Sequence, residues 1–284
     1  MADDSQLYTP AHHSGVLDQR LNLTDYIHPQ ETNLLNIAKS MEYNAGGQPS
    51  LRTQDFNLAV AQGKVPGVTG LSISGYRLST NTAFLPAWED GAYVYFTTAQ
   101  VVRVWSESAS DTNVSVVING LDANYEQQTE TVVLTNGTIG VLTAKQFLRI
   151  NSISLTRVPQ NAGIIHAGSS DKTITLAYIG TVNGGSAGRS QMTVYTVPAG
   201  YTFYLTQSNW YINSTQPASY RSWTQTPTGL INIVLTFPIL DQYNSLKVVP
   251  RPYPEKTDIQ WQASVQQNSS VGGQIEGYLV KNLT

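Results

Sequence analysis

From about residue 65 onward, apolar and polar residues alternate in short segments that are separated by turn residues. In segment 201–213, Tyr201, Phe203 and Leu205 alternate with more polar positions. A period of two predicts a strand with one buried face, and turn signals recurring at intervals of roughly ten residues are typical of an all-β sandwich. The predicted strands are 68–78, 92–98, 101–107, 114–120, 129–135, 147–156, 172–179, 190–197, 201–213, 220–226, 230–237, 245–250, 257–265 and 272–282.

The predicted fold class is therefore mainly β, with antiparallel sandwich or jelly-roll modules, because no helical period separates these strands. An Asn- and Gly-rich stretch at 159–169 divides the pattern. It predicts either a boundary between a β module of residues 66–160 and a β-sandwich module of residues 161–284, or a long loop within one continuous β domain.

The first 65 residues lack the period of two, and they predict an extended N-terminal arm with one short helix. Pro29 suits the first turn of that helix, and Leu34, Leu35, Ile37 and Ala38 follow at helical spacing. The apolar content favours an arm that docks on another protein, and a disordered tail is the alternative. The residues expected to contact the partner are Leu17, Leu21, Leu23, Tyr26, Ile27, Leu34, Leu35 and Ile37.

Composition narrows the classes of function. Charged residues make up only 12% of the chain, and 16 Lys and Arg face 19 Asp and Glu. Without a basic stripe, direct binding to nucleic acid is not expected. Low charge suits burial against other subunits as well as an ordinary β protein. The chain has no cysteine, shows no signal-peptide pattern at its start and has no apolar run long enough for a membrane span.

The segment "VVINGLDANYEQQTETVVLTNGT" (116–138) resembles a calcium loop at first, because Asp122, Asn124 and Glu126 alternate as oxygen ligands do. A helix–loop–helix site also needs Gly at its sixth position and Glu at its twelfth. Those positions hold Gln127 and Val133. The prediction is therefore a polar connection from Asn119 to Glu130 whose side chains satisfy backbone groups, although an irregular calcium site in a β-loop stays open.

Neither catalysis nor metal binding is predicted. Three of the four histidines, His12, His13 and His28, lie in the arm, and no cysteine completes a zinc set with them or with His166. No Gly-x-Ser-x-Gly elbow occurs, and the Asp90-Gly dipeptide is a turn signal. No catalytic residue, cofactor or metal ligand is assigned.

Aromatic residues of the second half allow two interpretations. Trp210, Tyr211, Tyr220 and Trp223 could stack on a glycan, or they could belong to a core or an interface. Trp210, Trp223 and Trp261 are expected to anchor the core.

Two segments resemble a group of virion structural proteins of tailed bacteriophages, especially phages of aquatic habitats. They are "INGLDANYEQQTETVVLTNGTIGVLTAKQFLRINSISL" (118–155) and "SQMTVYTVPAGYTFYLTQSNWYIN" (190–213), followed by "PEKTDIQWQASV" (254–265) and "EGYLVKN" (276–282). The arm segment "LTDYIHPQETNLLNIAKS" (23–40) is similar to the N-terminal stretch of some phage coat proteins, but the body lacks the pattern of that coat fold.

The resemblance implies a β-rich shell or tail component without catalytic residues. The leading hypothesis is a capsid decoration or cement protein, assembled in the host cytoplasm into the virion, that binds the major capsid protein through its arm. A homo-oligomer is expected, because symmetric particles repeat their parts. The alternative is a tail or fibre protein that attaches to a host glycan receptor. A capsule-degrading enzyme is the third alternative, for which no pair of carboxylates can be named.

Overall fold

The computed structural model describes residues 41–43, 49–51, 56–78, 82–88, 90–156, 161–182, 185–186 and 188–283. The chain divides into two compact units between Ala59 and Val60. The predicted arm contacts and the predicted helix after Pro29 lie outside the described residues. In the first unit, β1 (Met41–Tyr43) and β2 (Pro49–Leu51) pair antiparallel.

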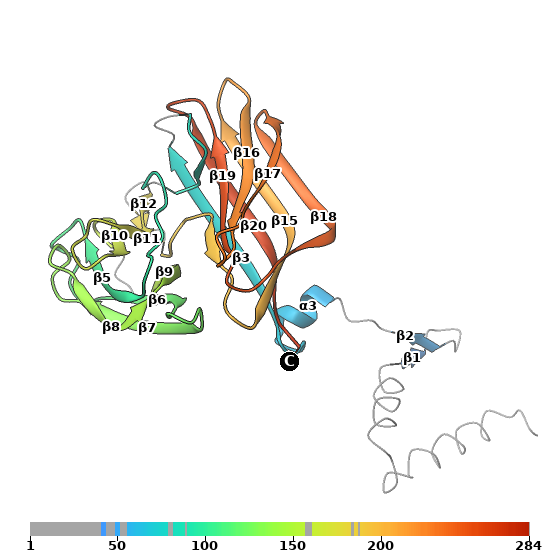
Figure 1. Cartoon of the computed structure of the whole chain (residues 1–284), viewed down its shortest axis with the longest axis horizontal. Helices are drawn as coiled ribbons and strands as arrows, with labels where there is room; N and C mark the ends of the chain where they lie inside the picture. The colour runs from blue at the N-terminus through green and yellow to red at the C-terminus, as the bar shows by residue number, and fades with distance from the viewer. Residues whose placement is uncertain are drawn as a thin grey trace, which may run out of the picture. The chain divides into compact units, whose positions relative to one another are not determined.

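The described part of the chain is mainly β, as predicted, with antiparallel sheets (Figure 1). Its single helix is the short α3 (Phe56–Ala61), which lies near the N-terminus but is a different segment from the helix predicted after Pro29. None of the described helical residues forms a segment of the length and hydropathy that a membrane span requires.

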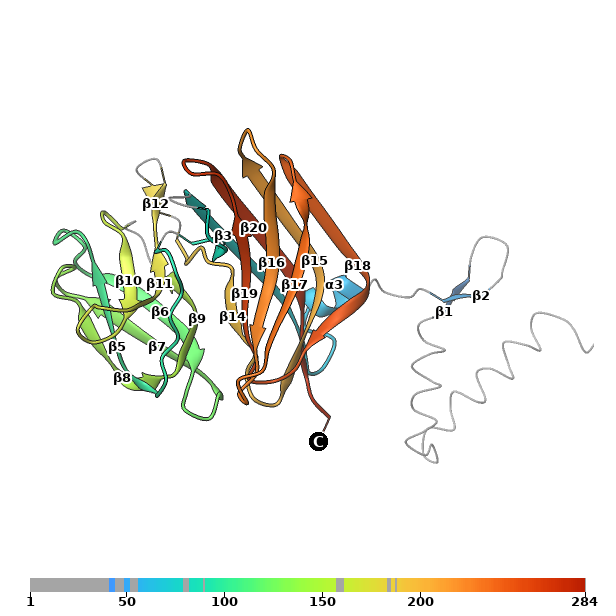
Figure 2. The same cartoon turned by 45° about the horizontal axis from the view of Figure 1, so that its top comes forward.

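The second unit contains two β modules, and the larger is a two-layer sandwich that we call the main sandwich (Figures 1 and 2). One layer, the outer sheet, has the strand order β18-β15-β20-β3, and the other, the seam sheet, has the order β14-β19-β16-β17 with β4 paired to β19. The bounds are β3 (Val68–Leu78), β4 (Leu85–Pro86), β14 (Val194–Thr196), β15 (Tyr201–Asn213), β16 (Ala218–Gln225), β17 (Ile231–Ile239), β18 (Gln242–Tyr253), β19 (Asp258–Ser264) and β20 (Ser270–Lys281).

Large aromatic residues fill the space between these two sheets. Trp210 of the outer sheet and Trp261 of the seam sheet are buried almost completely. The rings of Phe203 and Trp261 meet edge to face, with their centroids 6.1 Å apart. The burial of Trp210 and Trp261 confirms the prediction that these two residues anchor the core. Replacing a buried residue of this size by alanine costs about 3–5 kcal/mol of stability.

The smaller module, which we call the insert module, is formed by the chain between β4 and β14. Its two sheets have the strand orders β11-β10-β5-β8 and β7-β6-β9, and a short hairpin joins β12 to β13. The bounds are β5 (Gln100–Ser106), β6 (Val114–Leu121), β7 (Gln127–Leu134), β8 (Val141–Phe147), β9 (Arg149–Leu155), β10 (Ile165–Gly168), β11 (Thr175–Ile179), β12 (Thr181–Val182) and β13 (Gly185–Ser186).

The predicted division at residues 160 and 161 does not follow the sheets. β5 pairs with β10 across that position, and β3 pairs with the C-terminal strand β20. The chain therefore begins the main sandwich, leaves it to form the insert module, and returns to complete it. Strand and turn signals along the sequence do not predict this route, because they do not show which strands pair.

Several predicted strands need correction. β3 and β15 have the predicted bounds, but segment 92–98 is not a strand, and its Tyr93 and Phe96 are buried without a ladder. The connection after β6 is only 122–126, much shorter than predicted. Asn136 and Gly137 lie in the turn between β7 and β8, and this turn does not close a hairpin, because β7 and β8 belong to different sheets.

Candidate functional site: the seam between the two β modules

The strand β19 has two buried faces of opposite character. One face, with Ile259, Trp261 and Ala263, points into the main sandwich. The opposite face, with Asp258, Gln260 and Gln262, points away from it, to the other side of the seam sheet. Each of these polar residues is no more than 7% exposed. Polar residues on one face of an antiparallel strand normally contact water. Here they form a buried polar layer, which we call the seam: Asp258, Gln260 and Gln262.

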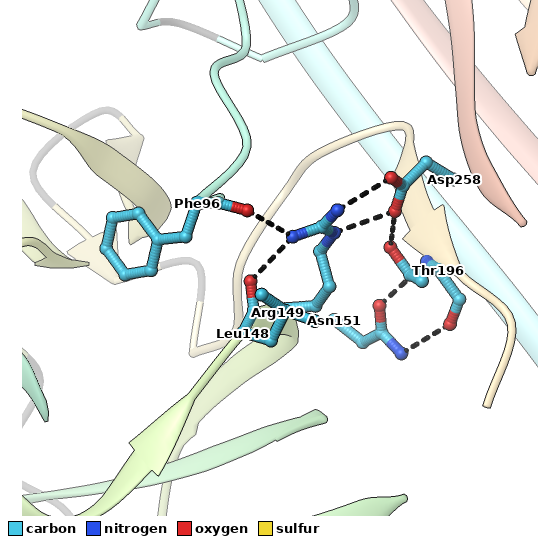
Figure 3. Close-up of polar contacts among 6 residues, drawn as sticks. All are labelled: Phe96, Leu148, Arg149, Asn151, Thr196 and Asp258. Atoms are coloured by element: carbon cyan, nitrogen blue, oxygen red, sulfur yellow. Dashed lines mark hydrogen bonds and ion pairs between the residues drawn. The ribbon is translucent and has the colours of Figure 1, made fainter. Parts of the chain in front are cut away.

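An ion pair joins the two modules at the seam. Arg149, the first residue of β9, donates from Nε to Oδ1 and from Nη2 to Oδ2 of Asp258, each over 2.8 Å. Its Nη1 donates to the carbonyls of Phe96 and Leu148, as Figure 3 shows. Paired donors of this kind match both the charge and the shape of a carboxylate, so the ion pair fixes the distance and the angle between the modules.

Neighbouring groups complete the hydrogen bonding of this pair. The hydroxyl of Thr196 donates to Oδ1 of Asp258 over 2.6 Å. The side-chain amide of Asn151 accepts from the backbone N–H of Thr196 over 2.8 Å and donates to its carbonyl over 2.9 Å. The strand β9 of the insert module is thereby joined to the strand β14 by two hydrogen bonds, and the Thr196 hydroxyl links β14 to Asp258 of β19 (Figure 3).

Aromatic rings enclose the guanidinium. Its carbon lies 4.7 Å from the ring centroid of Tyr95 and 5.7 Å from that of Tyr125. Burial opposes the charge of Arg149, but hydrogen bonds and attraction from Asp258 outweigh this effect, so the pKa of the guanidinium is raised. Burial likewise raises the pKa of the Tyr95 phenol. Arg149 therefore stays charged and Tyr95 stays neutral at any ordinary pH.

A cleft of about 650 Å³ opens above the ion pair. Its walls come from both modules and carry uncharged polar and aromatic groups, among them Thr97, Tyr125, Gln225 and Thr226. Because Asp258 already neutralises Arg149, the cleft offers no free charge to an anionic ligand. In the part of the chain that the structure describes, no group of three or more His, Asp or Glu side chains could hold a metal ion.

The loop that resembles a calcium site lies at the rim of this cleft. Oδ1 of Asp122 accepts the backbone N–H groups of Asn124 and Glu126, over 2.8 and 2.9 Å. Asp122 thus closes the turn, and the prediction that these side chains satisfy backbone groups is confirmed for this residue. The turn holds Tyr125 at a φ of 65°, which is uncommon for a bulky residue.

The four predicted glycan or interface aromatics separate in the structure. Trp210 and Tyr220 are buried in the main sandwich, so the core interpretation holds for them and a sugar cannot stack on them. Trp223 is half-buried, and its ring stacks on Tyr95 with the centroids 6.2 Å apart. Tyr211 is 55% exposed, and it alone of the four keeps the geometry that a glycan contact needs.

The sequence alone indicated no role for Arg149, Thr196 or Asp258. One signal was present: Arg149 interrupts the otherwise apolar run Phe147–Ile150, and a charged residue in such a run needs a buried partner. Nothing in the sequence identified Asp258 as that partner, 109 positions away.

No protein-family model matches the sequence, and no curated protein matches it significantly. The resemblance to phage virion proteins therefore stays a prediction.

Proposed function

We propose that the protein is a structural component of a bacteriophage virion that decorates and stabilises the head. One observation supports this proposal most directly. Three of the four segments of the β region that resemble phage virion proteins, 118–155, 190–213 and 254–265, contribute Arg149, Thr196 and Asp258, respectively, to the contacts between the modules. The segments that carry the resemblance thus supply residues that hold the two modules in one orientation, and a shell component under mechanical load requires such rigidity.

The arm is the proposed contact with the major capsid protein. Each of its apolar side chains, such as Leu21, Leu23 and Ile27, contributes about 1.5–3 kcal/mol when it is buried, before the cost of ordering the chain. Repetition over a symmetric shell multiplies this gain. Assembly of identical copies on the shell also agrees with the homo-oligomer expected from the sequence.

The test is co-sedimentation of the purified protein with purified heads that lack it. Deletion of residues 1–45 is expected to abolish binding while the β modules keep their unfolding transition. A sharper variant changes Leu21, Leu23 and Ile27 to Ser, and its matched control changes the polar neighbours Gln19 and Thr24 to Ala. Unchanged binding of both the deletion and the Ser variant would contradict the proposal.

Attachment to a host glycan as a tail or fibre protein is the second candidate, and the exposure of Tyr211 favours it. Imaging of a tagged copy in intact particles separates the two candidates. A label spread over the head supports decoration, whereas a label confined to the tail supports attachment.

A further inference from the structure

The exposed face of the outer sheet carries tyrosines and uncharged polar side chains in regular rows. Residues directly opposite one another in neighbouring strands share a face, so the pairing registers define the rows. One row contains Tyr211 and Tyr76 with Gly272 between them. The three rows used below are Gln242, Tyr211, Gly272 and Tyr76; Asn244, Asn209, Gln274 and Ser74; and Leu246, Gln207, Glu276 and Ser72.

Tyr211 and Tyr76 form a pair of aromatic platforms. They are 55% and 41% exposed. Their backbones are two strand spacings apart, about 10 Å. A Cβ added to Gly272 would meet nothing closer than 3.7 Å, the carbonyl oxygen of Gly75. The floor between the tyrosines is therefore open, and a ligand that covers both must be longer than one sugar ring.

The second and third rows supply hydrogen-bonding groups beside these platforms. The amide of Gln207 donates to the side-chain oxygen of Asn209 over 3.1 Å, and that of Gln274 donates to Glu276 over 2.7 Å. These bonds hold the side chains in fixed positions. An amide group carries one acceptor oxygen and two N–H donors. The side chains of these two rows can therefore both donate hydrogen bonds to hydroxyl groups and accept hydrogen bonds from them.

Charge selects the class of ligand. Glu276 is the sole side chain with a full charge among these twelve positions. Beside the rows, the guanidinium of Arg189 donates from Nη2 to the Ser74 hydroxyl over 3.0 Å, so one negative and one positive group leave no excess charge and favour a neutral ligand. Pyranose rings present C–H groups on one face and hydroxyl groups at the edge, which matches aromatic platforms flanked by amides.

We propose that this face of the outer sheet binds a neutral oligosaccharide, with Tyr211 and Tyr76 stacking on two of its rings and Asn209 and Gln274 bonding its hydroxyl groups. The inference rests on the second candidate function and is independent of head binding through the arm. Tyr211 was expected from the sequence as a glycan contact, whereas Tyr76 and Gly272 were not, because they lie far from it in the chain.

The experiment applies the full-length protein to an array of neutral and uronic-acid glycans. Neutral hexasaccharides of glucose, mannose and N-acetylglucosamine are then titrated by calorimetry. We expect binding to a neutral glycan, and a Kd at least about tenfold weaker in Tyr211→Ala and Tyr76→Ala. Gly272→Val is expected to block binding, because its side chain fills the floor while the strand β20 accepts a β-branched residue.

Tyr125→Ala is the matched control, since it removes a tyrosine from the cleft and not from the outer sheet. It is expected to leave the Kd unchanged. Binding that is lost in Tyr125→Ala alone, binding confined to the acidic glycans, or no binding at all would overturn the proposal. So would a self-association of the wild type, seen by light scattering, that the three outer-sheet variants abolish without any effect on sugar.

Discussion

Two regions of the main sandwich reverse the usual relation between polarity and burial. On the seam, Asp258, Gln260 and Gln262 are buried, although their alternation with apolar residues is typical of a face in contact with water. On the edge strand β18, by contrast, Leu246 and Val248 are 72% and 95% exposed. The alternation of polar and apolar residues therefore distinguishes the two faces of a strand, but it does not show what covers either face.

The two regions also differ in what they contribute to stability. The seam holds a charge pair that was removed from water, and such a pair is tolerated only when its hydrogen bonds are complete. The edge strand exposes apolar side chains and a row of backbone N–H and C=O groups to water, which lowers solubility but leaves no buried polar group without a partner. Four substitutions test this difference, from the largest expected effect to the smallest.

Arg149→Ala is expected to lower the free energy of unfolding by about 3–5 kcal/mol, because it leaves the carboxylate of Asp258 buried without its partner. Chemical denaturation measures the loss. The double variant Arg149→Met with Asp258→Leu is the control, and we expect it to recover much of the stability. A loss below 1 kcal/mol in Arg149→Ala would mean that water reaches the seam freely.

Thr196→Val is expected to cost about 1.5–3 kcal/mol, the contribution of a hydrogen bond to a charged group. The substitution keeps the shape of the side chain and removes only the donor to Asp258. Thr228→Val, at an exposed position of the β16–β17 loop, serves as the control and should leave the denaturation midpoint unchanged. Equal effects of the two variants would show that the Thr196 hydroxyl adds nothing to the seam.

Asp122→Ala is expected to cost about 1 kcal/mol, because the turn loses an acceptor for two backbone N–H groups at a partly exposed site. Hydrogen exchange at Asn124 and Glu126 should become faster, and Asp122→Asn should preserve much of the protection. If calcium stabilised the wild type and failed to stabilise Asp122→Ala, the loop would be a metal site after all.

Val248→Ser is expected to change the free energy of unfolding of the monomer by less than about 0.5 kcal/mol. The same substitution at Val104, which is fully buried, is the matched contrast and should be strongly destabilising. A large effect at Val248 that depends on protein concentration would show that the edge strand is covered by another copy.

The sequence predicted the class of fold because the period of two survives in each long strand. β3 and β15 were located to the residue, since their alternation is regular and turn residues bound them. β8 was missed because Lys145 and Gln146 interrupt its apolar positions. The segment 92–98 was assigned wrongly, since its aromatic residues pack in the core without forming a ladder.

The site was harder to predict than the fold, for a physical reason. An ion pair needs two groups that meet only after the chain has left the main sandwich and returned to it. The sequence places Arg149 and Asp258 in different strands but contains no information on which strands will face each other. Tyr211 and Tyr76 pose the same difficulty, because a row across a sheet is defined by register and not by spacing along the chain.

The chain leaves the main sandwich near Ala87 to form the insert module and returns beside the same point at Thr193. The backbone N–H of Ala87 donates to the hydroxyl of Thr193 over 2.8 Å, and the N–H of Thr193 returns a bond to the carbonyl of Ala87 over 3.2 Å. Two chain ends that meet in this way can be joined by a short peptide, so the insert could be gained or lost as a unit. Without it, the face that carries Asp258, Gln260 and Gln262 would be an ordinary hydrated surface, which is how its sequence is patterned.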